Sequence, residues 1–272
     1  MPHVVPNDIA TSIRRSKRAR RIHLRMDPVR GLEIVLPRGV SETVVPEVLA
    51  RHGEWIERTR VRMGVSTGGQ AAVVLPDFVE LHATGEIFRV LCIDKDGASV
   101  PYGSGAGYCT HGMETGSDMG SRPGVGAVVG ANGCKRVTVK ESPGLLRLPP
   151  CGDESGCEAL VRWLRRAAHV RLGAMLAEEA QRWQFSYARL RIGLPRTRWG
   201  SCSAKSDINL NARLLFLPPM VARHVVLHEL CHTCVRGHGP DFYTLLRSVD
   251  PAMDDACAAL RCAWQVIPPW AR

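Results

Sequence analysis

The stretch PPMVARHVVLHELCHTCV, residues 218–235, decides how this chain folds and which chemistry it can carry. Proline is tolerated in the first turn of a helix, so Pro218 and Pro219 predict that a helix begins there. His228 and His232 lie four residues apart, and residues at that spacing project from one helical face. The pair is therefore predicted to bind one metal ion through two imidazole rings.

Glu229 and His238 complete the predicted site. Glu229 is turned by about 100° around the helix from His228, which suits a general base beside the metal better than a ligand. Gly237 is expected to end the helix, and the turn there can direct His238 toward the metal. Three protein ligands and one open position are the arrangement of catalytic zinc sites. The sequence thus predicts a zinc-dependent hydrolase in which Glu229 accepts a proton from a metal-activated water.

The apolar surroundings favour this interpretation over the alternative of a helix that merely contains packed histidines. Buried histidine and glutamate side chains without partners would carry a desolvation penalty among the neighbouring valines and leucines. His224, one turn before His228, is expected to pack or to support the site, because three histidines already complete the ligand set.

Further blocks accompany this helix in a fixed order: RWGSCS (198–203), INLN (208–211), LPP (217–219), HELCH (228–232) and GHGPDFY (237–243). Together they resemble the YgjP-like metallopeptidase family, which is related to the SprT-like proteases within the zincins. The segments RRSKRARRIHLR (14–25) and VLPRGV (35–40) also resemble the opening strands of that family. The resemblance covers most of the chain apart from residues 96–134. Phe242-Tyr243 departs from the Phe-Trp pair that is common in the family, but keeps an aromatic side chain.

The resemblance implies that His228, His232 and His238 bind one zinc ion and that Glu229 is the general base. It also implies an edge strand at about residues 207–212 beside the active-site helix, where an extended peptide could add.

Two asparagines on the implied edge strand have two possible roles. Asn209 and Asn211 could bind substrate or brace the neighbouring loops, and bracing is the preferred interpretation. Trp199 and Cys202 are expected to pack, because a cysteine nucleophile would need its own base.

Periodicity predicts an α+β fold. Strands are expected within 11–25 and 31–37, helices after Ser41 and over 157–183, a hairpin around Ser142-Pro143-Gly144, and three strand-like pieces between 185 and 214. The resemblance adds a zincin-like core, in which a small antiparallel or mixed sheet packs on the active-site helix, preceded by a mostly β N-terminal portion. We predict a disordered N-terminus (1–11), a β-rich portion (12–95), a glycine-rich disordered insertion (96–134) and a metallopeptidase core (135–272).

Composition narrows the class of protein. The 272 residues are 45% hydrophobic and carry 36 Lys and Arg against 26 Asp and Glu, a net charge of +10 that favours anionic partners without selecting among them. The ten cysteines are expected to be reduced, since the chain is too long for a small disulfide scaffold. The sequence has no apolar run long enough to predict a membrane span, and its first residues do not have the pattern of a secretory signal. We expect a cytoplasmic protein, although the arginine-rich segment 14–25 leaves organelle targeting open.

Three functions stay open at this point. The leading one is a metallopeptidase acting on peptides or proteins. The second is a metal-dependent nucleoside triphosphate (UTP) pyrophosphatase at the same site, an activity ascribed to members of the family; no phosphate loop of the GxxxxGK[ST] type is present. The third is a SprT-like DNA-associated protease or binding module, for which the positive charge is permissive, but no zinc ribbon follows the catalytic region.

Overall fold

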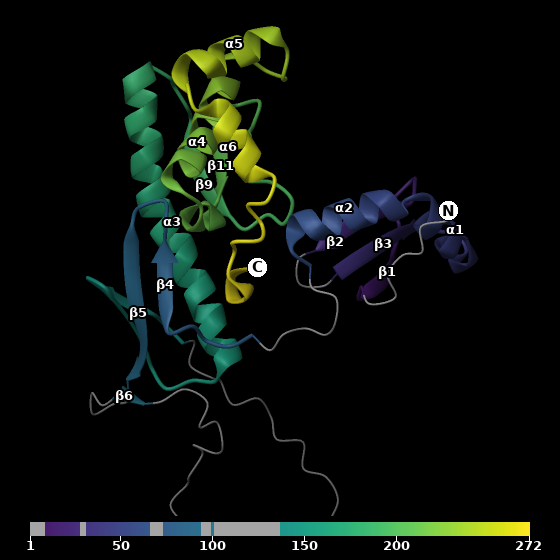
Figure 1. The fold of residues 1–272 in the computed structure, drawn as a ribbon, viewed down its shortest axis with the longest axis horizontal. Coiled ribbons are helices and arrows are strands. Elements are labelled where there is room, and N and C mark those ends of the chain that lie inside the picture. The colour runs from purple at the N-terminus through teal and green to yellow at the C-terminus, as the bar shows by residue number, and fades with distance from the viewer. Residues whose placement is uncertain (1–8, 28–30, 66–72, 94–98, 101–136) are drawn as a thin grey trace, which may run out of the picture.

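The computed structural model describes residues 9–27, 31–65, 73–93, 99–100 and 137–272, which form an α+β fold with small mixed sheets. Figure 1 shows two parts, an N-terminal lobe (9–27 and 31–65) and a main body (73–93 and 137–272). The predicted insertion at 96–134 lies outside the described residues apart from the short strand β6 (Ser99–Val100), as does most of the predicted disordered N-terminus. The division into domains stays a prediction.

The N-terminal lobe consists of a three-stranded sheet and two helices. β1 (Thr11–Ser16) is parallel to the central strand β3 (Gly31–Pro37), and β2 (His23–Asp27) is antiparallel to it. Strand structure was expected within residues 11–25. The structure has two strands there, β1 and the beginning of β2, and the highly charged residues 17–22 connect them.

The helices of this lobe begin where the sequence indicated. The Ser41 hydroxyl accepts a hydrogen bond from the backbone N–H of Thr43 and starts a 3-10 turn. The helices α1 (Val45–Arg51) and α2 (Gly53–Met63) follow this turn.

The main body contains a second sheet in the order β4-β5-β8-β7, with β6 paired to β5. Its main strands are β4 (Phe78–Leu81), β5 (Glu86–Ile93), β7 (Lys140–Ser142) and β8 (Leu145–Leu148). The predicted hairpin around Pro143 is confirmed, since β7 and β8 pair antiparallel. β5 pairs with both β4 and β8, so residues before and after the 96–134 segment belong to one sheet.

A single long helix, α3 (Asp153–Trp183), runs along the main body beside this sheet (Figure 1). It confirms the predicted helix and begins four residues earlier than expected. Its buried face follows helical spacing and includes Leu160, Leu164, Ala168 and Leu172. On the partly exposed side, Arg171 donates to Glu86 of β5 and Glu141 of β7, which ties the helix to the sheet.

The third sheet positions the predicted site and corrects one expectation. β11 (Asp207–Asn211) is the central strand, antiparallel to β10 (Gly200–Cys202) and parallel to β9 (Arg189–Gly193). The prediction of an edge strand at about 207–212 is therefore wrong. The chain turns at Ser206, which has a positive φ of 59°, so that the 200–202 segment folds back onto β11 and takes the edge itself.

The remaining elements complete the main body around α4 (Pro219–Cys234). They are the 3-10 turn η2 (Ala212–Phe216), the helices α5 (Pro240–Val249) and α6 (Met253–Leu260), and the 3-10 turn η3 (Pro269–Ala271). α4 contacts α3, α5, α6 and β10. No helix in the described ranges combines the length and the hydropathy that crossing a bilayer would need.

A buried ion pair joins α3 to α4. Glu179 is only 4% exposed, and its carboxylate accepts hydrogen bonds from Nε and Nη2 of Arg223 at 2.6 and 2.9 Å. Removing one member of a buried pair is costly, because the other charge stays desolvated without its partner.

We expect Glu179→Gln to lower the free energy of unfolding by about 2 kcal/mol, because Arg223 loses the nearer of its two carboxylate partners. Urea denaturation followed by circular dichroism measures this loss. The matched control is Glu178→Gln, a neighbouring exposed position, which should change stability by less than about 0.5 kcal/mol. Equal losses in the two variants would contradict the assignment.

Candidate metal centre

Helix α4 and the turn after it bring three histidines together. α4 begins at the predicted prolines and carries His228 and His232. It ends at Cys234, earlier than expected, and Gly237, with a φ of +85°, provides the turn that precedes His238. The Nε2 atom of His238 lies 3.0 Å from that of His228 and 3.2 Å from that of His232.

The spacing of these nitrogens fits a metal ion. The Nε2 atoms of His228 and His232 are also 3.2 Å apart, so the three atoms form a nearly regular triangle. Tetrahedral zinc with Zn–N bonds of about 2.1 Å requires ligand nitrogens about 3.4 Å apart. Three imidazoles can thus hold one ion and leave a fourth position open.

The protonation of the rings suits metal binding. The Nδ1–H of His232 donates to the Val235 carbonyl at 3.2 Å, which leaves the lone pair on Nε2 directed at the cluster. Burial, followed by the neighbouring His232 and His238, lowers the pKa of His228 to about 3. Burial also lowers the pKa of His232. The neutral rings are the form that binds a metal.

Phe242 supports all three rings from beneath. This side chain of α5 is fully buried and stacks on His232 with ring centroids 4.4 Å apart. Its edges contact His228 and His238, each at a centroid distance of 4.9 Å. Phe242, the aromatic residue expected after His238, therefore fixes the orientation of the three imidazole rings.

Glu229 is held next to the cluster in an unusual environment. It is 5% exposed, and among the described residues its Oε2 atom has no hydrogen-bond partner. Burial raises the pKa of its carboxyl to about 7, and the positive charge of Arg198 opposes the rise. A buried carboxyl that titrates near neutrality is suited to accept and return a proton.

Gly200 makes room for this carboxyl. A Cβ atom at position 200 would lie 2.5 Å from Oε1 and 2.7 Å from Cγ of Glu229. Strand β10 can therefore approach α4 only because residue 200 lacks a side chain. Sequence reasoning did not single out Gly200, although it stands inside the RWGSCS block.

The site opens to solvent through a cleft of about 380 Å³. It is lined by the three histidines and Glu229, and also by Arg198, residues 200–202 and Arg236. The Arg236 side chain donates to the Ala204 carbonyl and so holds the loop after β10. Neither arginine was predicted as a site residue, because loop arginines carry no recognisable spacing.

His224 supports α4 instead of joining the ligands. It is buried, and its Nδ1 lies 2.6 Å from Oδ2 of Asp250, at the end of α5. Its ring centroid is 6.1 Å from that of His228. The expectation that His224 packs or supports the site agrees with these contacts.

The two asparagines do not line the cleft. Asn211 is fully buried, and its side-chain amide donates to the carbonyls of Pro195 and Arg198. Asn209 is paired with Ser201 and therefore lies on the opposite face of the sheet from Gly200. Bracing is the role that the contacts of Asn211 support.

The cysteines nearby take part in packing. All eight cysteines of the described residues are free of disulfides, and Cys231 of α4 is fully buried. Burial raises the pKa of the Cys231 thiol to about 12 and also raises that of Cys202. These thiols lack the low pKa of reactive cysteines.

Gly200→Ala should disrupt the site, because the new methyl group would collide with the Glu229 carboxyl. We expect a loss of about 1–3 kcal/mol in the free energy of unfolding, together with displacement of Glu229. The matched control is Gly152→Ala, where a Cβ would meet nothing within 4 Å. A Gly200→Ala protein as stable as this control would refute the close approach.

The raised pKa of Glu229 predicts a pH-dependent stability in the metal-free protein. The folded carboxyl holds its proton up to about pH 7 and the unfolded one only to about 4.5, so wild type should lose stability as the pH rises between these values. Glu229→Gln lacks this loss, and its stability relative to wild type should grow by about 3 kcal/mol across the window. Urea denaturation with a chelator measures the difference, in which the histidine contributions cancel. A difference that does not change with pH would contradict the buried carboxyl.

Comparison with known families places this site in context. Residues 131–262 match the family model described as YgjP-like, metallopeptidase domain. No curated protein and no solved structure matches the chain. The matched segment contains α4, the three histidines, Glu229 and all of the third sheet, whereas the N-terminal lobe precedes it. Residues 131–262 are therefore similar to a YgjP-like metallopeptidase domain, which indicates a metal-dependent hydrolase.

Proposed function

We propose that this chain is a zinc-dependent hydrolase, specifically a metallopeptidase, with His228, His232 and His238 as ligands and Glu229 as the general base. The observation that carries the proposal is the buried Glu229 carboxyl beside three convergent imidazole nitrogens. Such a carboxyl costs folding energy, and a catalytic role explains why the site retains it. The match to a metallopeptidase family supports a peptide or protein substrate.

Each residue of the proposed site would have a separate role in the reaction. A zinc ion held by the three histidines would polarise the scissile carbonyl and lower the pKa of a water molecule. Glu229 would accept the proton that the attacking water loses and pass it to the leaving nitrogen. Arg198, which lines the same cleft, would place positive charge near the oxygen on which negative charge develops.

Strand β10 offers a place for an extended substrate. It is hydrogen-bonded to β11 on one side only, so within the described sheet its other edge is free. The same residues, 200–202, line the metal cleft. A peptide added to this edge would lie beside Glu229, which moves the proposed β-augmentation from the central strand β11 to β10.

Glu229→Gln should separate metal binding from catalysis. The variant keeps the shape of the side chain and all three histidines, so we expect it to bind zinc as wild type does. Cleavage of an unfolded protein substrate should fall by a factor of about 100 or more, since the general base is lost. Metal content and product formation, measured on both proteins, check the two halves of this expectation.

The control is His224→Gln, which alters a neighbouring histidine outside the ligand set and should reduce activity far less. An active Glu229→Gln enzyme would disprove the mechanism. A nucleotide panel tested in parallel decides the substrate class: release of pyrophosphate without peptide cleavage by wild type would overturn the peptidase assignment.

A further inference from the structure

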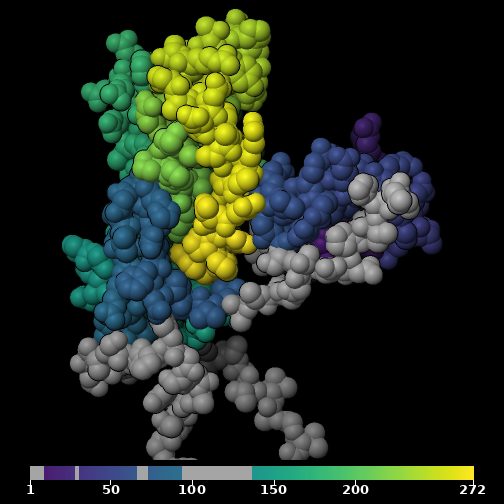
Figure 2. Space-filling view, viewed as in Figure 1, coloured from purple at the N-terminus to yellow at the C-terminus, as the bar shows by residue number. Residues whose placement is uncertain are grey.

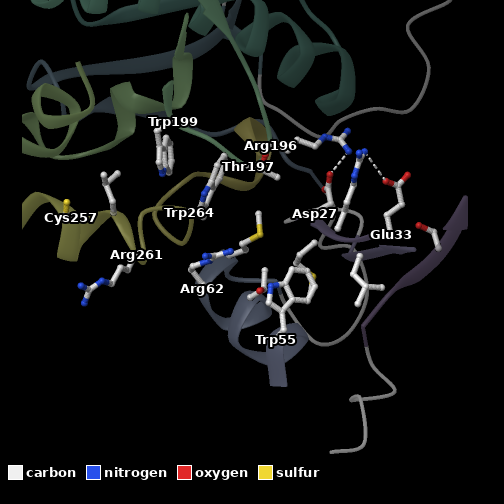
Figure 3. A pocket seen from close by; sticks show the side chains of 17 residues that line it. Asp27, Glu33, Trp55, Arg62, Arg196, Thr197, Trp199, Cys257, Arg261 and Trp264 are labelled. Atoms are coloured by element: carbon white, nitrogen blue, oxygen red, sulfur yellow. Dashed lines mark ion pairs between the residues drawn. The ribbon is translucent and has the colours of Figure 1, made fainter. Parts of the chain in front are cut away.

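A second and larger cleft lies between the N-terminal lobe and the main body. We call it the interlobe cleft; its volume is about 860 Å³, which is within the range of ligand-binding sites. Figure 2 shows the two lobes side by side, and Figure 3 shows the side chains that line the space between them. α2 contributes Trp55 and Arg62 from one side, and the main body contributes Trp199, Arg261 and Trp264 from the other.

Tryptophans form an aromatic wall in this cleft. Trp199 and Trp264 are stacked, with ring centroids 4.3 Å apart and planes 24° apart. Trp55 comes from the other lobe and keeps 36% of its surface exposed. Trp264 is buried and Trp199 is partly buried, so these two rings form a fixed apolar surface, while Trp55 presents the exposed indole. An exposed indole in a cleft is typical of a position where a partner is anchored.

The interlobe cleft contains arginine side chains that have no carboxylate partner among the described residues. Asp27 pairs with Arg196 at 2.5 Å, and Glu33 pairs with Arg14 at 2.8 Å, so both lining carboxylates are already compensated. Arg62 and Arg261 are exposed, and neither has a carboxylate partner among the described residues. The cleft therefore presents two guanidinium groups that can pair with carboxylates of a ligand.

A strand edge borders the same space. β2 pairs only with β3 in the described sheet, which leaves its other edge open. Residues 24–27 of β2 line the interlobe cleft. An open edge offers main-chain donors and acceptors that match an extended polypeptide and have no counterpart in a nucleic acid.

The interlobe cleft and the metal cleft share one wall. Along residues 196–202, Arg196, Thr197 and Trp199 line the interlobe cleft. Arg198 and the following residues 200–202 line the metal cleft. A chain held in one cleft is therefore separated from the other by a single segment of backbone.

We propose that the interlobe cleft binds an extended, acidic segment of a polypeptide. The main chain of the segment adds to the open edge of β2, its acidic side chains pair with Arg62 and Arg261, and its apolar side chains pack on the tryptophan wall. That this segment belongs to a substrate rests on the proposed peptidase function. The binding itself does not, and it is measurable in a catalytically inactive protein.

The test uses the Glu229→Gln protein and a fluorescein-labelled synthetic peptide of alternating Glu and Phe residues. Fluorescence anisotropy should show binding that weakens with added salt, because the contacts are partly between charges. A peptide with Lys in place of Glu should bind at least about tenfold more weakly. A labelled oligothymidylate of equal charge should compete poorly, since it cannot pair with the β2 edge.

Matched variants locate the binding. Arg62→Gln combined with Arg261→Gln should weaken binding about tenfold, whereas Arg38→Gln with Arg165→Gln removes the same charge from exposed positions outside the cleft and should change it little. Trp55→Ala, at an exposed site, should also weaken binding about tenfold or more. No binding, equal losses in both double variants, or stronger binding of the oligonucleotide would each overturn the proposal. If wild type cleaves no peptide, the peptidase function is contradicted, but the binding measured with the Glu229→Gln protein is unaffected.

Discussion

Helix α4 must be buried on nearly every side and still carry polar groups, and the arrangement of the main body follows from this constraint. It packs against α3, α5, α6 and β10, so each polar side chain needs its own partner. Arg223 pairs with Glu179 of α3, and His224 pairs with Asp250 at the end of α5. The ring nitrogens of His228 and His232 converge with that of His238. Among the buried polar side chains of α4, Glu229 keeps a carboxyl oxygen without a hydrogen-bond partner in the described structure.

The active chemistry that we propose depends on how closely a sheet can approach that helix. Gly200 lets β10 pass directly over the Glu229 carboxyl, which buries it and raises its pKa. The same approach brings a free strand edge to the mouth of the metal cleft. The burial of Glu229 and the position of the free β10 edge thus have one structural cause.

The N-terminal lobe forms a second cleft with the main body, where we propose that a polypeptide binds. Arg196 pairs with Asp27, while Gln265 and Arg272 donate to the carbonyls of Val61 and Gly64 near the end of α2, so polar contacts hold the lobe against the main body. The cleft between the lobes is lined by the exposed Trp55, the stacked Trp199 and Trp264, and the exposed Arg62 and Arg261. The 196–202 segment is common to both clefts, which offers a physical route by which one polypeptide could engage both lobes.

The sequence by itself determined the helix that begins at Pro219 and the four-residue spacing that places His228 and His232 together, because both depend on the local periodicity of one helix. It also indicated His238, since the glycine turn lies close by in the chain. Only the tertiary structure decided that β10, and not β11, is the edge strand, and that Gly200 lies against Glu229. The pairing of His224 with Asp250 and the lining of the interlobe cleft were also decided there. These features join residues far apart in the chain. Their contacts depend on how whole elements pack, and such packing produces no periodic pattern in the sequence.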